Sequence, residues 1–189
     1  MYMTYVQIAC GFTGAMTLMF LWRSLLRKFG TIPSLSVHFS PRGGCTETVV
    51  AEIGKARSEI LVLAYSFSSK PIAEALIEAK KRGVHVEIIL DKSNEVETYS
   101  DLHLFAEQGL APLVDAHHAI AHNKVMVIDK KTLITGSFNF THQAEAENGE
   151  NLLVIKGQPD LIALYRGNFT SHKEHSRQPE QKAPHQRAA

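Results

Sequence analysis

A stretch in the second half of the chain, residues 122–141, constrains the fold more than any other part of the sequence. It contains, in order, His122, Lys124, Asp129, Gly136, Ser137, Asn139 and Thr141, and apolar residues occupy 125–128. In an extended strand, side chains two residues apart project from the same face. The stretch therefore predicts a strand over 122–129 that presents the His122 imidazole and the Lys124 ammonium side by side.

These residue types suit the chemistry of a phosphodiester. The negative charge of a diester repels nucleophiles, so cleavage needs cationic and hydrogen-bond donors on the non-bridging oxygens, an attacking group and a proton for the leaving oxygen. The Lys124 ammonium, the Ser137 hydroxyl and the Asn139 amide are suitable donors that would bind the substrate. The neutral imidazole of His122 can attack phosphorus to form a phosphohistidine. Because side chains supply every role, no metal or other cofactor is required.

Some residues of this stretch also have purely structural explanations. Gly136 suits a turn that needs a positive φ. Asn139 and Thr141 are common residues at the start of a helix, where their side chains cap free backbone N–H groups. Asn139 could serve both a helix and a phosphate.

The spacing of these residues resembles the signature of the phospholipase D superfamily. The motif is His122-x-Lys124-(x)4-Asp129, followed by Gly136-Ser137 and Asn139. Over roughly residues 35–170 the chain is similar to small bacterial members that carry one copy of the motif, including the plasmid-type, EDTA-resistant endonuclease. The further segments that carry this resemblance are Phe39-Ser40-Pro41, Ala64-Tyr65-Ser66-Phe67 and Glu150-Asn151.

The resemblance implies a covalent two-step mechanism in a homodimer. Members with one motif copy obtain the second from a two-fold related subunit, and this chain has no second copy, because neither His85 nor His103 is followed by the motif. One His122 would attack phosphorus, and the other would protonate the leaving oxygen and later deprotonate water. By the same resemblance, Glu150 would hold a ring nitrogen of His122, whereas Asp129 would have a supporting, structural role at the end of the strand.

The N-terminal part of the chain predicts a membrane anchor. Residues 5–22 carry no charge, and Arg23, Arg27 and Lys28 come directly after them. About 20 apolar residues span a bilayer, and basic residues after the span favour a cytoplasmic location for the domain on that side. We therefore expect an N-terminal transmembrane helix within residues 1–30. The alternative is a cleaved signal sequence with export to the periplasm, which the polar Gln7 and the glycines of this segment leave open.

The remaining sequence predicts an α/β domain over residues 37–171, preceded by a linker over 31–36. Apolar periodicity indicates strands alternating with helices, which favours a mixed β-sheet layered between helices, as in the phospholipase D fold. The polar residues 172–189 predict a disordered tail. The expected strands are 37–39, 59–67, 84–90, 112–114, 122–129, 132–135 and 151–155. The expected helices are 46–57, 70–82, 99–108, 139–146 and 159–171.

A metal site is one further possibility in the sequence. Asp115, His117, His118 and His122 lie close enough along the chain to suggest one. However, the phosphodiesterase motif explains His122 better, and adjacent loop histidines are more often solvated, so no metal is predicted. Cys10 and Cys45 are too few for a zinc site, and we expect no disulfide between them.

The charge of the chain leaves the substrate open. Residues 31–170 hold 13 basic and 17 acidic side chains, a net charge of −4, although nucleases usually gain affinity from a basic surface. Lys130 and Lys131 beside the site, with Lys80–Arg82 elsewhere, would have to supply a local patch. A phosphodiesterase acting on DNA or RNA is favoured. The alternatives are a phospholipase D acting on phospholipid headgroups, which the anchor supports, and an inactive membrane-tethered binding module, which the intact motif disfavours.

Overall fold

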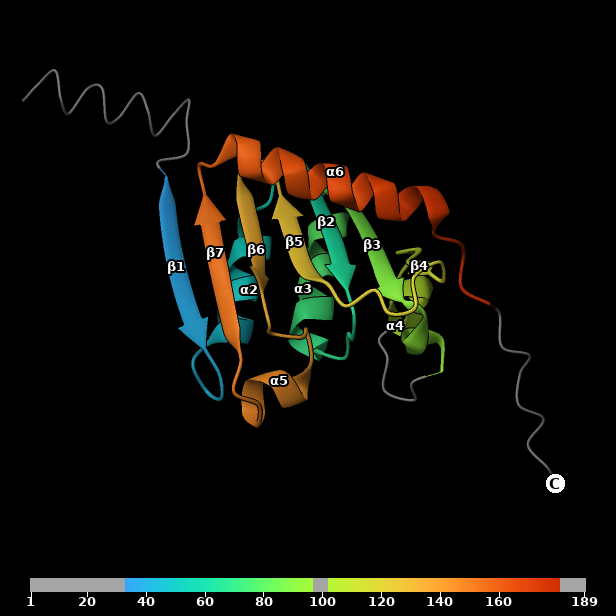
Figure 1. Ribbon diagram of the computed structural model, residues 1–189, viewed down its shortest axis with the longest axis horizontal. Helices are drawn as coiled ribbons and strands as arrows, with labels where there is room; N and C mark the ends of the chain where they lie inside the picture. The colour runs from blue at the N-terminus through green and yellow to red at the C-terminus, as the bar shows by residue number, and fades with distance from the viewer. Residues whose placement is uncertain (1–32, 97–101, 181–189) are drawn as a thin grey trace, which may run out of the picture.

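The chain folds around one mixed β-sheet with helices on both faces. The computed structural model describes residues 33–96 and 102–180. The sheet has seven strands in the order β1-β7-β6-β5-β2-β3-β4 (Figure 1). Strands β2, β3 and β4 run parallel, whereas β5, β6, β7 and β1 pair antiparallel with their neighbours. The prediction of a mixed sheet layered between helices is therefore confirmed.

The elements follow the predicted order closely. The strands are β1 (Ser34–Phe39), β2 (Glu59–Ala64), β3 (His85–Asp91), β4 (Leu113–Asp115), β5 (Lys124–Ile128), β6 (Thr132–Gly136) and β7 (Asn151–Lys156). The helices are α2 (Cys45–Lys55), α3 (Lys70–Lys81), α4 (Leu102–Glu107), α5 (His142–Ala146) and α6 (Pro159–His175), and a short 3-10 helix, η1, covers Lys92–Glu95.

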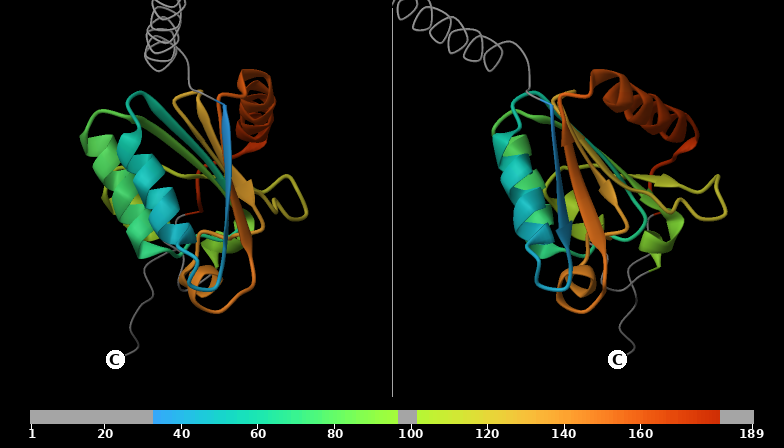
Figure 2. Two further views of the ribbon diagram at one scale, coloured as in Figure 1. Left: turned by 90° about the vertical axis from the view of Figure 1, so that its left-hand side faces the viewer. Right: turned by 60° about the vertical axis from the view of Figure 1, so that its left-hand side comes forward.

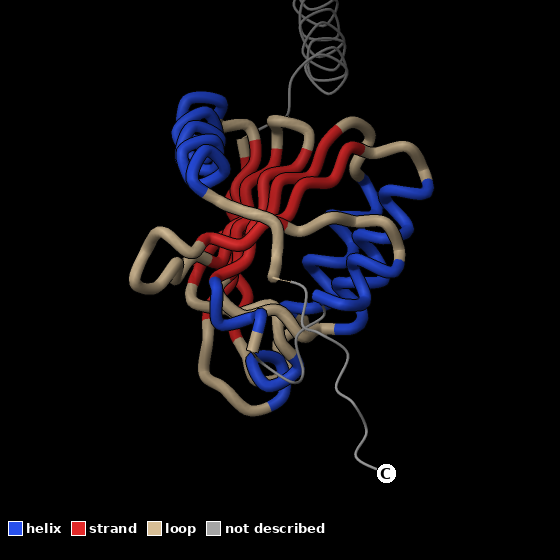
Figure 3. Tube along the Cα trace, turned by 90° about the vertical axis from the view of Figure 1, so that its right-hand side faces the viewer, coloured by secondary structure: helices blue, strands red, loops and turns tan. Residues whose placement is uncertain are grey.

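The central strands explain why both faces of the sheet are covered. All five residues of β5 are buried, so neither face of the strand is available to solvent. Met126 and Ile128 pack toward α2 and α3, whereas Val125 and Val127 pack with Ile162 and Phe169 of α6. Helices α2 and α3 accordingly lie on one face of the sheet and α6 crosses the other (Figures 2 and 3). An uninterrupted apolar run in the middle of a sheet requires such a sandwich.

Local sequence signals set the limits of several helices. Pro71 lies in the first turn of α3, where its missing N–H costs nothing, and Gly83 follows the helix with a φ of 87°. Thr141 caps α5 by accepting a hydrogen bond from the backbone N–H of Ala144 at 3.1 Å. The Glu145 carboxylate on α5 accepts hydrogen bonds from the backbone N–H groups of Gly44 and Thr46 at the start of α2. Helix α5 is thereby fastened to α2.

Several boundaries differ from the predictions, since β2 ends at Ala64 and not at 67, and α5 begins at His142 and not at 139. Strand β1 begins at Ser34, inside the expected linker, because it pairs with β7 as far as Lys156. The motif strand begins at Lys124, so His122 lies in the loop before it. The disordered tail expected from residue 172 is wrong for residues 172–180. Helix α6 continues to His175, and Arg177 forms a backbone bridge with Val114.

Other predictions concern parts of the chain outside the described residues. They are the N-terminal anchor over 1–30, the first residues of the helix expected over 99–108, and the tail from 181 onward. None of the helices in the described part of the chain has the length and apolar character needed to cross a bilayer.

Candidate active site

The side chains of His122 and Lys124 meet at the ring of Tyr65. The ring centroids of His122 and Tyr65 are 4.5 Å apart, and the Lys124 Nζ lies 4.9 Å from the Tyr65 centroid. Tyr65 directly follows β2, which pairs with β5 up to the register of Ala64 with Lys124. Tyr65 was not among the predicted site residues. The signal that could have found it is its position after a buried strand, where the motif strand begins.

Lys124 is a buried ammonium close to a carboxylate. Lys124 is only 7% exposed to solvent. Burial lowers the pKa of Lys124, and the negative charge of Glu150 opposes that effect. A cation with little hydration interacts more strongly with a bound phosphate than one in water does. The predicted role of Lys124 in binding the non-bridging oxygens therefore has a physical basis in its surroundings.

Hydrogen bonds to the backbone fix the loop before β5, which carries His122. The N–H of Ala121 donates to the buried carboxylate of Asp91 at 2.7 Å, and the N–H of Tyr65 donates to the carbonyl of Asn123 at 2.7 Å. Asn94 donates from its amide to the Tyr65 carbonyl at 2.6 Å. Within the residues that the structure describes, the imidazole itself forms no hydrogen bond. His122 is exposed, so a substrate can reach its ring.

Glu150 does not hold the His122 ring within one protomer. Its carboxylate accepts a hydrogen bond from the Asn148 amide at 3.3 Å, and its backbone pairs with Ser40. The reason is topological, because Glu150 precedes β7 and strand β6 separates β7 from β5. The expectation of a direct contact is therefore not met in the single chain, where Glu150 acts on Lys124 through its charge.

Ser137 is fixed in place by Asn151. Its Oγ accepts hydrogen bonds from the backbone N–H of Asn151 at 3.1 Å and from the Asn151 amide at 3.2 Å. The backbone N–H groups of Ser137 and Phe138 both donate to the Asn151 carbonyl. Because both bonds to Oγ are accepted ones, the hydroxyl hydrogen of Ser137 remains available for a substrate oxygen.

Gly136 permits this close approach of two backbones. It has a φ of 146°, and a Cβ at this position would lie 2.3 Å from the Asn151 carbonyl oxygen. Replacing Gly136 by alanine is expected to lower the free energy of unfolding by at least about 2 kcal/mol, because strain at an unfavourable φ adds to the clash. Thermal or urea unfolding measures the effect. The matched control is Gly149→Ala, where a Cβ meets nothing within 4 Å, and equal stability of both variants would contradict the explanation.

Asn139 lies on the segment that joins β6 to α5. Its side-chain oxygen is buried and finds no hydrogen-bond partner among the described residues. The neighbouring Phe140 carbonyl accepts from the N–H groups of Ser68 and Ser69, which brings this segment beside the one that follows β2. A buried polar atom without a partner is costly, so Asn139 is a group that a ligand or a second subunit could satisfy. Thr141, and not Asn139, caps α5.

Asp129 lies at the opposite end of β5 from Lys124. Its carboxylate accepts hydrogen bonds from the N–H groups of residues 57–59 and from the Ser58 hydroxyl, at 2.7–3.0 Å. Burial would raise the pKa of Asp129, but these hydrogen bonds outweigh it and hold the pKa below its usual value. This carboxylate ties two loops together and is remote from the site. Lys130 and Lys131 follow it, so the basic patch expected beside the site is wrong.

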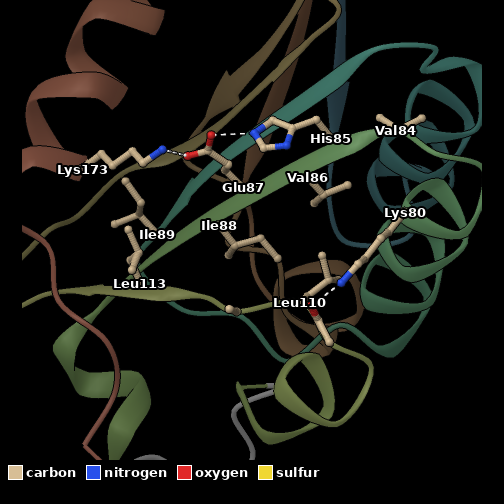
Figure 4. Close-up of a pocket in the computed structure, with 12 residues that line it drawn as sticks. Lys80, Val84, His85, Val86, Glu87, Ile88, Ile89, Leu110, Leu113 and Lys173 are labelled. Atoms are coloured by element: carbon tan, nitrogen blue, oxygen red, sulfur yellow. Dashed lines mark hydrogen bonds and ion pairs between the residues drawn. The ribbon is translucent and has the colours of Figure 1, made fainter.

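A hollow of about 440 Å³ lies along β3 and is separate from the site (Figure 4). It forms because β4 pairs only with Ile89–Asp91, which leaves the first half of β3 without a neighbour on that side. Lys80, Glu87, Leu110 and Lys173 are among its lining residues, and Glu87 pairs with both Lys173 and His85. His85 begins β3, whereas the strand ends near the site at Asp91. The hollow therefore contributes nothing to the His122 region.

Known proteins are similar to this chain in sequence. The family model described as cardiolipin synthase, PLD-like domain, matches residues 49–173. A phospholipase D of Rickettsia bellii is 43% identical over 139 residues, covering 74% of this chain and 69% of that protein. A mitochondrial cardiolipin hydrolase of Mus musculus is 35% identical over 114 residues, 60% of this chain and 51% of that protein.

Two solved structures share the fold of this chain. Nuc from Salmonella typhimurium, a phospholipase D family member, superposes with a TM-score of 0.75 at 35% identity, over 79% of this chain and 100% of that one. NucT from Helicobacter pylori superposes with a TM-score of 0.70 at 22% identity, over 78% of this chain and 99% of that one, and supports the fold alone.

Proposed function

Because this chain belongs to the phospholipase D superfamily, we propose that it cleaves phosphodiesters through a phosphohistidine on His122, at a site shared by two copies of the chain. It is a phosphodiester hydrolase. The observation that carries the proposal is the meeting of the exposed His122 imidazole and the buried Lys124 ammonium at the Tyr65 ring. A nucleophile and a cation are thus held together where β2 ends and β5 begins.

In the first step, a ring nitrogen of His122 attacks phosphorus. The nitrogen–phosphorus bond forms as the bond from phosphorus to the leaving oxygen breaks, and His122 of the partner subunit donates a proton to that oxygen. Lys124 and the Ser137 hydroxyl stabilise the charge on the non-bridging oxygens. Asn139 could add a hydrogen bond from its amide.

In the second step, water releases the product. His122 of the partner subunit, now neutral, takes a proton from a water molecule that attacks phosphorus. The nitrogen–phosphorus bond breaks, which regenerates the His122 imidazole and leaves a phosphomonoester. The same pair of histidines thus serves both steps, and side chains provide the nucleophile, the acid and the cation.

An uncovered apolar row on β1 supports a dimer. The side chains of Leu35, Val37 and Phe39 share one face of this edge strand and are 50–67% exposed. Phe39 lies at the end of β1 that pairs with Asn151, on the same edge of the sheet as Gly136 and Glu150. Contiguous exposed apolar side chains on an edge strand are typical of an interface. A second copy docked here would lie beside the end of the site formed by Gly136 and Glu150, with β7 and β6 between β1 and the motif strand β5.

Replacing Val37 by lysine is expected to weaken self-association at least about 100-fold, because a charge would be buried without a partner. Sedimentation of the full chain at assay concentration should then show monomers with little activity, whereas the unchanged protein is a dimer. The matched control is Val96→Lys, at an exposed valine that directly follows η1 and lies away from β1. An active monomer of the unchanged protein would overturn the shared site.

Nucleic acid is the substrate class that we propose first. The similarity to small single-motif endonucleases extends over the whole domain, and the alignment with Nuc covers all of that chain. Phospholipid is the second candidate, because related proteins carry the names phospholipase D and mitochondrial cardiolipin hydrolase. A membrane anchor within residues 1–30, which the sequence predicts, would hold the site near phospholipid headgroups on the cytoplasmic side.

One experiment separates the two classes. The purified protein is offered single-stranded DNA, duplex DNA, RNA, phosphatidylcholine vesicles and cardiolipin vesicles in EDTA, with His122→Ala as the blank. A melting curve in the same buffer shows that the protein is folded. Cleavage of DNA or RNA that the variant lacks would support a nuclease. Hydrolysis of lipid alone would mean that the protein is a phospholipase and not a nuclease. The absence of any His122-dependent cleavage of a diester would overturn the proposal.

A further inference from the structure

Four potential metal ligands meet between β4 and α6, outside the proposed phosphodiesterase site. They are Asp115 at the end of β4, His118 in the following loop, and His172 and His175 on α6. One ligand atom from each side chain lies within 4.8 Å of the others. His117 and His122, which the sequence grouped with Asp115 and His118, are not among them. Their places are taken by His172 and His175, from the segment expected to be disordered.

The Asp115 carboxylate is oriented for this cluster by the backbone. Asp115 is fully buried, and its Oδ1 accepts hydrogen bonds from the backbone N–H groups of His117 and His118. Its Oδ2 therefore faces the imidazoles alone. The distances from Oδ2 are 2.6 Å to His172 Nδ1, 2.9 Å to His118 Nδ1 and 3.4 Å to His175 Nε2. Three ring nitrogens thus converge on one oxygen.

Hydrogen bonding alone is a poor explanation for this convergence. Each neutral imidazole has one N–H, and three of them would have to point at a single oxygen atom while the rings crowd together. The ring centroids of His118, His172 and His175 are 4.7–5.5 Å apart. If the rings were instead protonated, three cations would compete for one carboxylate. A divalent ion resolves the crowding, because it accepts a lone pair from every ligand.

We propose that Asp115, His118, His172 and His175 bind one Zn²⁺ ion. Tetrahedral Zn²⁺ with bonds of about 2.0–2.1 Å keeps neighbouring ligand atoms about 3.3 Å apart, and the three distances from Asp115 Oδ2 bracket that value. Three imidazoles and one carboxylate are a ligand set for zinc and similar transition metals, whereas Mg²⁺ and Ca²⁺ prefer oxygen ligands. The cluster supplies four protein ligands, which is typical of a structural site.

The burial of the ligands suits a metal. Asp115 and His172 are buried, whereas His118 and His175 are partly exposed and leave a path for an ion to enter.

The location of the cluster indicates what the ion would do. It would join the C-terminal turn of α6 to the loop that leads from β4 to His122. The backbone bridge between Val114 and Arg177 lies on one side of the cluster. On the other side, the hydrogen bond from the Ala121 N–H to the Asp91 carboxylate fixes the loop. Zn²⁺ would thus act as a clamp on the segment that carries the nucleophile, without touching the substrate.

The test is a measurement of zinc binding by the full chain. Protein stripped with EDTA and dialysed is titrated with Zn²⁺, and bound metal is counted after gel filtration. We expect one ion per chain and a higher melting temperature. His118→Gln and His175→Gln, at partly exposed positions that should tolerate the change, are expected to weaken binding at least about 100-fold, since even residues that merely orient a ligand cost about 10–100-fold.

The matched control is His85→Gln, an exposed histidine that pairs with Glu87 at the far side of the hollow. It should bind Zn²⁺ as the unchanged protein does. Substituting Co²⁺ gives a second readout, because tetrahedral coordination by nitrogen produces visible absorption that the two ligand variants should lose. Failure to retain zinc, or equal retention by the ligand variants, would overturn the site. Neither result depends on phosphodiesterase activity.

Discussion

Replacing His122 by alanine is expected to lower kcat by at least about 10⁴-fold on any phosphodiester that the protein cleaves. In a dimer that shares its site, one substitution removes both the nucleophile and the acid, because one His122 attacks phosphorus and His122 of the partner subunit is the acid. The fold should not change, since the ring is exposed and forms no hydrogen bond among the described residues. Single-turnover cleavage with excess enzyme measures the loss.

His85→Ala is the matched control for this loss. His85 is also an exposed histidine, but it begins β3 at the opposite end of that strand from the site. It should keep full activity. Activity of His122→Ala within about tenfold of the unchanged protein would remove His122 from the mechanism, whatever the substrate.

Replacing Lys124 by alanine is expected to reduce kcat/KM by about 10²- to 10³-fold. The reason is the loss of a poorly hydrated positive charge beside the phosphate, an effect comparable to the removal of one donor from an oxyanion hole. Alanine would also remove the packing of the Lys124 side chain against Tyr65 and the cation that interacts with the Glu150 charge. A methionine at this position, which keeps most of the side-chain volume, separates the charge from the packing.

The matched control for Lys124 is Lys130→Ala. Lys130 follows the other end of β5 and is exposed. Its substitution should change neither kcat nor KM by more than about twofold. An equal effect of the two substitutions would mean that general charge, and not the position of the Lys124 ammonium, accounts for activity.

Much of the fold followed from local patterns in the sequence. The apolar runs of β2 and β5 predict strands covered on both faces, and Pro71 and Gly83 mark the limits of α3 because they act on the backbone locally. The pairing of His122 with Lys124 was likewise predictable, since it depends on two residues of one short segment. The contact of both with Tyr65 required knowledge that β2 and β5 are neighbours.

The failed predictions concern residues that depend on distant partners. His172 and His175 lie in a polar segment, but their rings contact the carboxylate of Asp115, which is more than 50 residues earlier in the sequence. Lys130 and Lys131 were expected near His122 because they are close in sequence. A strand rises about 3.3 Å per residue, so the length of β5 carries them to the opposite edge. Glu150 is separated from His122 by β6, which only the strand order reveals.

The most direct test of the mechanism is to trap the covalent intermediate. Protein mixed with an excess of the diester that it cleaves is quenched in alkaline denaturant, because phosphohistidine is stable to base, and its peptides are analysed by mass spectrometry. We expect one adduct, on His122, that contains phosphorus and the retained part of the substrate, and that disappears in His122→Ala. An active enzyme that yields no adduct, or an adduct on another residue, would contradict it.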